Sequence, residues 1–378
     1  MVLTSILVYG SLTAIMFFSG KYAAKRQEDR WEIGLDTPFF VPEIILIFLA
    51  FCFVCGARWN VGADSLIYLR NYLYLQDTGH FISRYDFELL FSVISKIFAL
   101  LHVHFFFYFA FWAFLQLFFI FYAFKNERYL YPYFAIIIIL GSLFFTWNNG
   151  MRQSLAACIF VYSYKFIERR QFLKFLITII LASLIHQSVI LCLIFYFILN
   201  RDIPFNKYWY LFILIISAFI GTTTLWTTFS QNIEKFFSSL GYGGYEGKTE
   251  YMIKTINLGG RSLILLITCA INIWFFPEVY KYFNHAKRVK IFFIMYYIGI
   301  SGFFLLFSAY VISRITYYFL IFQIPSLAYL FLYAKNNKKL VYYGLIAIFI
   351  IYSLANYYLE LGVPSESTNY RFFWNHII

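Results

Sequence analysis

Long apolar segments alternate with short polar segments along almost the whole chain. Most of the apolar segments have roughly 17–22 residues, the length that an α-helix needs to cross the hydrocarbon core of a bilayer. Because backbone polar groups inside a bilayer must be paired within the protein, these segments are expected to be helical. The pattern predicts about twelve membrane-spanning helices. Their expected limits are residues 2–20, 39–57, 103–124, 130–147, 150–167, 171–186, 188–200, 208–227, 261–277, 290–309, 314–334 and 340–358.

The composition favours an all-α polytopic integral membrane protein. The 378 residues are 62% hydrophobic and only 13% charged, and a soluble domain of this length could not bury so much apolar surface. Aromatic residues reach 24%, and phenylalanine and tyrosine suit lipid-facing and interfacial positions. Since the sequence shows no internal repeat and no second domain, residues 1–378 are predicted to form a single transmembrane domain.

Two long connections separate the predicted helices. The first, residues 58–102, contains the apolar stretch 87–101, which is short for a span and is followed by a small, uncharged turn. We therefore expect interfacial amphipathic helices on the outer face of the membrane here. The second connection, residues 228–260, is rich in glycine and tyrosine, which predicts a mobile surface loop.

The basic residues predict how the chain is oriented. When alternate loops are assigned to alternate sides, 19 of the 30 Lys and Arg residues fall on one side. The positive-inside rule makes that side cytoplasmic and places both termini outside. The net charge of +12 therefore does not require a nucleic-acid partner. The basic loops lie at residues 21–30, 125–128, 165–174, 201–207, 281–290 and 335–339.

Cysteine usage indicates no redox chemistry. All five cysteines lie inside apolar segments, whereas redox and metal sites need accessible, activated thiolates. We predict no metal site and no cofactor from the sequence.

The stretch NNGMRQ joins two predicted spans with almost no loop, and it places Arg152 in the first turn of the second span. An arginine at a helix N-terminus opposes the helix dipole, so helix stability does not explain it. Its planar fork suits a carboxylate or a phosphate, and the free N–H groups of the helix start also favour an anion. Asn149 and Gln153 are the predicted supporting residues of this anion site.

The segment after the second predicted span offers Arg58, Asn60 and Asp64 around a glycine. These residues either close the helix end through an Arg58–Asp64 ion pair or hold an anion contact in place. In the next acidic pair, Asp86 either caps the following helix or serves the site, and Glu88 either stabilises the dipole of that helix from its first turn or serves the site.

Three further residues lie at predicted span ends on the outer side. His186 is either an interfacial histidine with local partners or a group that binds phosphate or transfers a proton. Arg261 and Arg314 either extend to lipid headgroups or join the site, and Tyr317, three residues after Arg314, is a supporting residue.

These residues converge on one membrane face under the predicted topology. Four arginines at about one depth, Arg58, Arg152, Arg261 and Arg314, are typical of a site for a highly charged anion. A pyrophosphate at the membrane surface, attached to a lipid whose tail stays in the bilayer, fits this pattern.

The same motifs resemble the EpsG/Wzy-like polymerases of bacterial O-antigen, capsule and exopolysaccharide synthesis. The matching pieces are R-x-N-x-G-x-D at residues 58–64, the aromatic-acidic patch ending at Glu88, N-G-x-R-Q at 149–153, H-x-S at 186–188 and R-x-x-x-Y-F at 314–319. They cover roughly residues 55–320 in the expected order. The most specific piece is N-x-x-R-Q followed about 33 residues later by H-x-S.

The resemblance implies a multi-pass glycosyltransferase with a GT-C-like membrane fold in the bacterial inner (cytoplasmic) membrane, with its active site facing the periplasm or exterior. It would polymerise undecaprenyl-pyrophosphate-linked oligosaccharide repeat units into O-antigen chains (a part of lipopolysaccharide) or into capsular or exopolysaccharide chains. Lipid-linked glycans would be both donor and acceptor, and a chain-length regulator and a flippase are the implied protein partners. No metal is required, because arginines can stabilise the leaving pyrophosphate.

The residue roles that follow are expectations. Arg152 and Arg314 are expected on the pyrophosphate, supported by Arg58 and Arg261. Glu88, Asp64 and His186 are the catalytic candidates, and the sequence does not rank them as the base for the acceptor hydroxyl. Two other functions remain open: a flippase or transporter of lipid-linked oligosaccharide, which predicts charges in mid-span, and an O-antigen ligase, which sequence separates poorly from a polymerase.

Overall fold

The computed structural model describes residues 2–62, 64–83, 87–141, 143–237, 260–306, 313–358 and 369–375. Throughout these ranges the regular elements are helices, and the one backbone bridge outside them joins Arg58 to Phe372. The predicted all-helical fold class is thereby confirmed.

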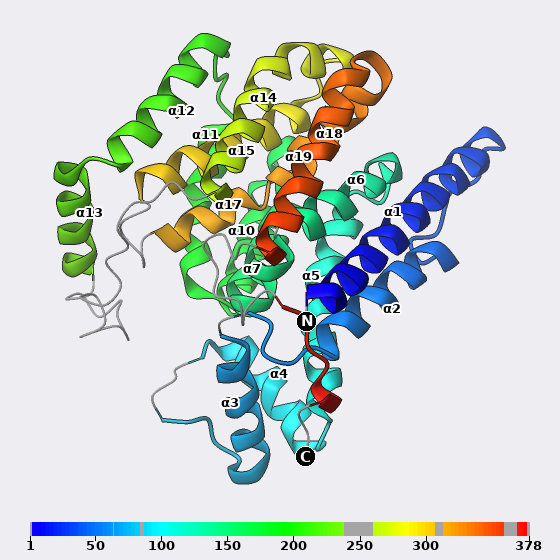
Figure 1. The fold of residues 1–378 in the computed structure, drawn as a ribbon, viewed down its shortest axis with the longest axis vertical. Coiled ribbons are helices and arrows are strands. Elements are labelled where there is room, and N and C mark those ends of the chain that lie inside the picture. Colours follow the sequence, from blue (N-terminus) through cyan, green and yellow to red (C-terminus); the bar gives the residue numbers. More distant parts are fainter. Residues whose placement is uncertain are drawn as a thin grey trace.

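The N-terminal part contains the longer helices α1, α2 and α5 and two shorter helices, α3 and α4, which lie at one end of this group (Figure 1). Helix α2 packs between α1 and α5, and α5 also packs against α8 in the centre of the molecule. Helices α3 and α4 contact each other below this group in Figure 1. The bounds are α1 (Val2–Glu32), α2 (Pro42–Gly56), α3 (Ser65–Thr78), α4 (Leu89–Leu100) and α5 (Phe105–Ala123).

The middle of the chain consists of short, interrupted helices. Its first part, Arg128–Leu140 followed by Leu143–Asn149, bends by 64° at the break between the two pieces. The bounds are η1 (Arg128–Leu130), α6 (Tyr131–Ala135), η2 (Ile136–Leu140), α7 (Leu143–Asn149), α8 (Met151–Tyr162), α9 (Tyr164–Glu168), α10 (Phe172–Ser183), η3 (Gln187–Leu193) and α11 (Ile194–Leu199).

The C-terminal part packs α15 against α12, α14, α17 and α18, and α19 covers α18. The bounds are α12 (Lys207–Gly221), α13 (Thr224–Phe237), α14 (Gly260–Tyr282), α15 (Lys287–Leu305), η6 (Arg314–Thr316), α17 (Tyr317–Leu320), α18 (Gln323–Asn337), α19 (Lys339–Tyr358) and η7 (Phe373–Asn375). The first ten residues of the predicted loop 228–260 belong to α13, and residues 238–259 lie outside the described part of the chain.

Helices occupy each of the twelve segments predicted to span the membrane. Among the described residues, five helices are long and apolar enough to cross a bilayer, or six if the bent pair forms one span. The other predicted spans coincide with shorter helices such as α2, α10 and α12. The chain is thus a helical membrane protein, while the count of twelve spans and the sidedness of the termini stay predictions.

Helix α4 has the features expected of an interfacial helix. Leu89, Val93, Ile97 and Leu100 are exposed at helical spacing, while Phe91, Ser95 and Ala99 are buried on the other face. The amide of Leu90 donates to the carbonyl oxygen of Leu184 at 2.8 Å, which ties the start of α4 to the end of α10. Its placement at the membrane interface stays a prediction.

Helix α8 forms the buried axis of the structure. Ten of its twelve residues are buried; Arg152 at its start and Tyr162 at its end are the two that are partly exposed. A helix that is packed on all sides needs small and apolar side chains. Residues 155–161, with the sequence LAACIFV, supply them between these two ends. The two ends of α8 therefore reach two separate surfaces of the protein.

The described C-terminal residues 369–375 return to the N-terminal helices (Figure 1). The amide of Tyr370 donates to Ser5 Oγ at 2.8 Å, and the amide of Trp59 donates to the carbonyl oxygen of Arg371 at 2.8 Å. The two ends of the described chain thus lie at the same end of the bundle.

Gly62 allows the segment after α2 to lie against the α7–α8 junction. Its φ is +98°, and a Cβ placed there would be 2.9 Å from the backbone carbon of Asn148. Residues with a side chain are strained at this φ, and here the backbone of Asn148 also blocks the space.

We expect Gly62→Ala to destabilise the protein by about 1–3 kcal/mol, because it combines backbone strain with a collision. Thermal unfolding in detergent would measure this change. Gly79→Ala is the matched control, since Gly79 has φ +72° but no heavy atom within 4 Å of the point that a Cβ would occupy. Equal losses in the two variants would show that the close approach to Asn148 contributes nothing.

Candidate functional site

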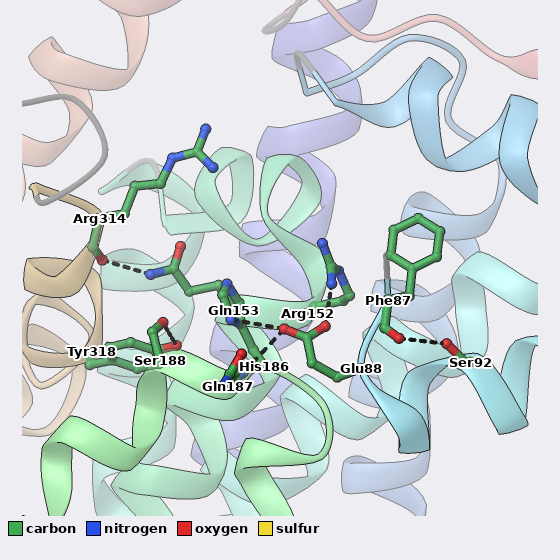
Figure 2. A network of polar contacts seen from close by, with 10 residues as sticks. All are labelled: Phe87, Glu88, Ser92, Arg152, Gln153, His186, Gln187, Ser188, Arg314 and Tyr318. Atoms are coloured by element: carbon green, nitrogen blue, oxygen red, sulfur yellow. Dashed lines mark hydrogen bonds and ion pairs between the residues drawn. The ribbon is translucent and has the colours of Figure 1, made fainter. Parts of the chain in front are cut away.

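Three segments that are distant in the sequence meet at the start of α8 (Figure 2). Arg152 Nη1 donates a hydrogen bond to Glu88 Oε2. The other carboxylate oxygen of Glu88 accepts from the amide of Gln187 at 3.1 Å and lies 3.4 Å from His186 Nδ1. Glu88 therefore links α8 to the turn between α10 and η3.

The local sequence explains how Glu88 reaches this position. Glu88 is the residue before α4, with an extended backbone (φ −62°, ψ 155°), so its side chain is free of the helix that follows. The Ser92 hydroxyl donates to the carbonyl oxygen of Phe87 at 3.0 Å and closes the first turn of α4. The position of Glu88 just before α4 is compatible with a favourable interaction with the dipole of that helix. Its side chain also forms an ion pair with Arg152.

Aromatic rings hold the Arg152 guanidinium in place. Its central carbon lies 4.6 Å from the centroid of the Phe87 ring and 5.5 Å from that of Phe91. The Arg152 side chain is 20% exposed, and its Nε is buried without a hydrogen-bond partner among the described residues. Glu88 thus engages one nitrogen of the fork, and the buried Nε keeps an unused N–H donor.

Asn149 and Gln153, the predicted supporting residues, each hold another candidate near Arg152. Asn149 Oδ1 accepts from the amide of Asp64 at 2.8 Å, and Gln153 Nε2 donates to the carbonyl oxygen of Arg314 at 2.6 Å. Figure 2 shows the Arg314 guanidinium directed away from Gln153. The amides beside Arg152 therefore act as connectors that gather Asp64 and Arg314 around α8.

Asp64 lies within the electrostatic reach of both arginines. Burial raises the pKa of the Asp64 carboxyl, and the charges of Arg314 and Arg152 partly oppose that rise. No ion pair joins Asp64 to Arg58 in the described structure, so the helix-closing alternative is not what the fold shows. A carboxylate with a raised pKa next to two arginines is a candidate general base.

His186, in the turn after α10, is held in its neutral form by its surroundings. Burial lowers the pKa of His186 to about 4; Glu88 raises it, and the charges of Arg152 and Arg314 lower it further. The unfolded chain binds a proton below the ordinary pKa of about 6.5, and the folded protein does not. His186 therefore reduces stability as the pH falls from about 6.5 toward 4.

We expect His186→Gln to flatten this part of the stability profile. The wild-type melting temperature should fall more steeply between pH 6.5 and pH 4 than that of the variant, because glutamine cannot bind the extra proton in the unfolded state. Thermal unfolding at several pH values measures both slopes. His80→Gln, at an exposed position, is the control. Parallel profiles for wild type and His186→Gln would contradict the burial of a neutral imidazole.

Two residues that sequence reasoning did not single out complete the cluster. The Ser188 and Tyr318 hydroxyls are 2.8 Å apart, and the Tyr318 ring lies 6.3 Å from the His186 ring. The predicted neighbour, Tyr317, instead lines a small internal cavity of about 30 Å³. Ser188 and Tyr318 are part of the H-x-S and R-x-x-x-Y-F motifs, so the motifs held the signal, but the helical register decided which tyrosine faces His186.

Four other candidates from the sequence remain: Arg58, Asn60, Arg261 and Asp86. The Arg58 guanidinium donates to the carbonyl oxygen of Cys55 at 2.6 Å and to Met151 Sδ at 3.5 Å, and it lies 4.7 Å from the centroid of the Phe109 ring. Arg58 is thus buried behind the start of α8. Asn60 has a positive φ of 53° and shapes the turn before Gly62. The side chain of Arg261 and all of Asp86 lie outside the described residues.

The start of the buried helix α8 thus gathers two arginines, two carboxylates and one neutral imidazole, namely Arg152, Arg314, Asp64, Glu88 and His186. Over the described ranges, no three His, Cys, Asp or Glu side chains are grouped so as to hold a metal ion. The cations gathered here are the arginines Arg152 and Arg314, and arginine binds phosphate oxygens in a planar, bidentate manner.

Comparisons with known proteins identify one family. The model of the EpsG family matches residues 44–372, a range that includes Asp64, Glu88, Arg152, His186 and Arg314. No curated protein and no solved structure matches the chain.

Proposed function

The chain belongs to the EpsG family, and from this premise we propose that it polymerises lipid-linked oligosaccharide repeat units on the outer face of the bacterial inner membrane. Membership associates the chain with polysaccharide polymerase activity. The donor is a glycan on undecaprenyl pyrophosphate, and the acceptor is a second lipid-linked repeat unit. The product is an exopolysaccharide, capsular or O-antigen chain.

The observation that carries the proposal is the partly exposed Arg152 at the end of a buried helix, paired with Glu88 and close to Arg314. A helical membrane protein does not need such a group for folding, because an arginine opposes the dipole at a helix start. A lipid pyrophosphate brings its charged group to a span end, where Arg152 lies, while its tail remains in the bilayer. Site and substrate thus have matching charge and depth.

The reaction that fits these groups is a glycosyl transfer. The acceptor hydroxyl oxygen forms a bond to the anomeric carbon of the donor while the bond from that carbon to the pyrophosphate oxygen breaks. Negative charge grows on the departing oxygen, and Arg152 and Arg314 stabilise it; donors of this kind typically contribute about 10²–10³ in rate. The proton of the acceptor hydroxyl passes to a base.

We infer that Asp64 is the base. Its carboxyl makes no hydrogen bond to a described residue, and burial raises its pKa. Glu88 is instead occupied by Arg152 and the amide of Gln187, and it serves to position the guanidinium and His186. Neutral His186 then supplies a hydrogen-bonding group for the leaving pyrophosphate or the acceptor.

Reconstitution with a defined substrate tests the function. The purified protein in proteoliposomes would receive a lipid-pyrophosphate-linked repeat unit, and products would be separated by size. A ladder of increasing repeat number, with release of the lipid pyrophosphate, supports polymerisation. A transported but unextended substrate would show a flippase, and transfer to a lipid A core without extension would show a ligase.

A further inference from the structure

A second candidate site lies at the end of α8 that is opposite to Arg152. Met151 and Glu168 are 17 residues apart along α8 and α9, which corresponds to about 25 Å of helix. Around Tyr162, Lys165 and Glu168 the surface forms a pocket with a volume of about 520 Å³. This volume lies within the range of about 300–1,000 Å³ that is typical of small-molecule sites.

Basic side chains from three parts of the chain converge on this pocket. Lys125 follows α5, Lys165 belongs to α9, Arg169 ends α9, and Lys174 lies in the first turn of α10. None of the four forms an ion pair with a described carboxylate. Their charges are therefore available to a ligand.

The acidic residues of the pocket do not neutralise these four. Glu127 lies 3.0 Å from Arg288 Nε and accepts a hydrogen bond from the Tyr129 hydroxyl at 2.8 Å. Glu168 lies 3.8 Å from Arg288 Nη1. Because Arg288 already lies between both carboxylates, the pocket carries a net positive charge.

Aromatic rings orient the lysines without removing their charge. Lys165 Nζ lies 3.4 Å from the centroid of the Tyr162 ring, and Lys125 Nζ lies 4.9 Å from that of Tyr122. The two rings stack with centroids 6.1 Å apart. A cation–π contact positions an ammonium group without using all three of its N–H donors, so both lysines remain able to bind an anion.

Basic residues on a membrane protein often face lipid headgroups as scattered surface charges. Lys338 and Lys339, in the exposed turn between α18 and α19, have that character. The pocket differs because four cations without an ion-pair partner line one concavity, together with aromatic rings and the partly exposed Arg288–Glu127 pair.

We propose that this pocket binds a ligand that carries a phosphate or diphosphate group. The ligand is either an anionic phospholipid headgroup of the adjacent leaflet or a soluble phosphate compound, and both present the same oxygen acceptors to the lysines and Arg169. This site is separate from the polymerase site, so its occupancy does not depend on the proposed function.

Two probes distinguish the sources. Binding of inorganic pyrophosphate is measured in nanodiscs of phosphatidylcholine, with the full chain carrying Arg152→Ala so that the polymerase site does not contribute. Retention of phosphatidylglycerol is measured by mass spectrometry after reconstitution in mixed vesicles.

The pocket variant is Lys165→Gln/Arg169→Gln. The control variant, Lys338→Gln/Lys339→Gln, removes the same charge at an exposed turn. Lys174→Gln, at an exposed position, is the variant with the least risk for folding.

We expect the pocket variant to weaken pyrophosphate binding by at least about 10-fold, since it loses charge-assisted contacts, while the control variant keeps wild-type affinity. Loss of phosphatidylglycerol retention alone, confined to the pocket variant, supports a lipid source. Absence of binding for both probes, or equal binding by pocket and control variants, overturns the proposal. If the double variant does not fold, unchanged binding of both probes by Lys174→Gln overturns it.

Discussion

Arg152→Ala is expected to reduce the rate of chain extension by about 100-fold or more, the effect typical of removing one fixed donor at a developing negative charge. The alanine variant loses the fork that we propose to contact the leaving pyrophosphate, and Glu88 loses its charged partner. The measurement is the initial rate of ladder formation in proteoliposomes. In deletion cells complemented with the variant, surface glycan should stop at single repeat units.

Two further variants separate charge, geometry and expression. Arg152→Lys keeps a cation but cannot bind two oxygens in a planar fork, so its rate should lie between those of wild type and alanine. Arg70→Ala removes an exposed arginine of α3 and should leave the rate unchanged. Full activity of Arg152→Ala at matched membrane levels would show that the anion site lies elsewhere.

Glu88→Gln is expected to lower the rate by about 10–100-fold, because a misplacement of about 1 Å in a catalytic group has costs of this size. The amide can still accept from the Gln187 backbone, but it no longer pairs electrostatically with Arg152. Arg152 and His186 then lose the group that holds them together. Initial rates at several donor concentrations would measure the change in kcat and KM.

The pH profile distinguishes a positioning role from a base. If Asp64 is the base, the acid limb of the kcat/KM profile lies above the ordinary aspartate pKa of about 3.9, because burial raises that of Asp64. Glu88→Gln should lower the whole profile and keep the limb, whereas Asp64→Asn should remove it. Asp77→Asn, at an exposed position of α3, is the control. Loss of the limb in Glu88→Gln alone would make Glu88 the base.

Local information in the sequence was sufficient to locate the helices. The apolar segments are long and uninterrupted, and burial of a backbone in a bilayer leaves a helix as the simplest way to pair its polar groups. Helices accordingly occupy all twelve predicted segments. The interruptions were harder to predict, because the 64° bend before α7 depends on how neighbouring helices cover the freed backbone groups.

The unusual position of Arg152 was also evident from the sequence. An arginine in the first turn of an apolar helix contradicts the dipole preference, and that contradiction can be recognised without knowing any contact. The same reasoning identified Asn149 and Gln153, since they are neighbours of Arg152 in the chain. Their roles as connectors to Asp64 and Arg314 required the structure.

Arg58 shows where local reasoning ends. By its motif and its predicted membrane side, it belonged with the other arginines, yet its guanidinium is buried against Cys55, Met151 and Phe109. The side chain of an arginine is long enough to point into several neighbouring spaces. Only the packing of α2, α5 and α8 selects one of them.

The sequence by itself determined a helical membrane protein, its family motifs and an unusual arginine at a helix start, for which it predicts anion binding. The tertiary structure alone decided that Glu88 pairs with Arg152 across 64 residues, that Tyr318 rather than Tyr317 faces His186, and that the far end of α8 opens into a basic pocket. The physical reason is the range of the interactions. Hydrophobic periodicity and helix dipoles act within one segment, whereas ion pairs between segments depend on which helices pack together.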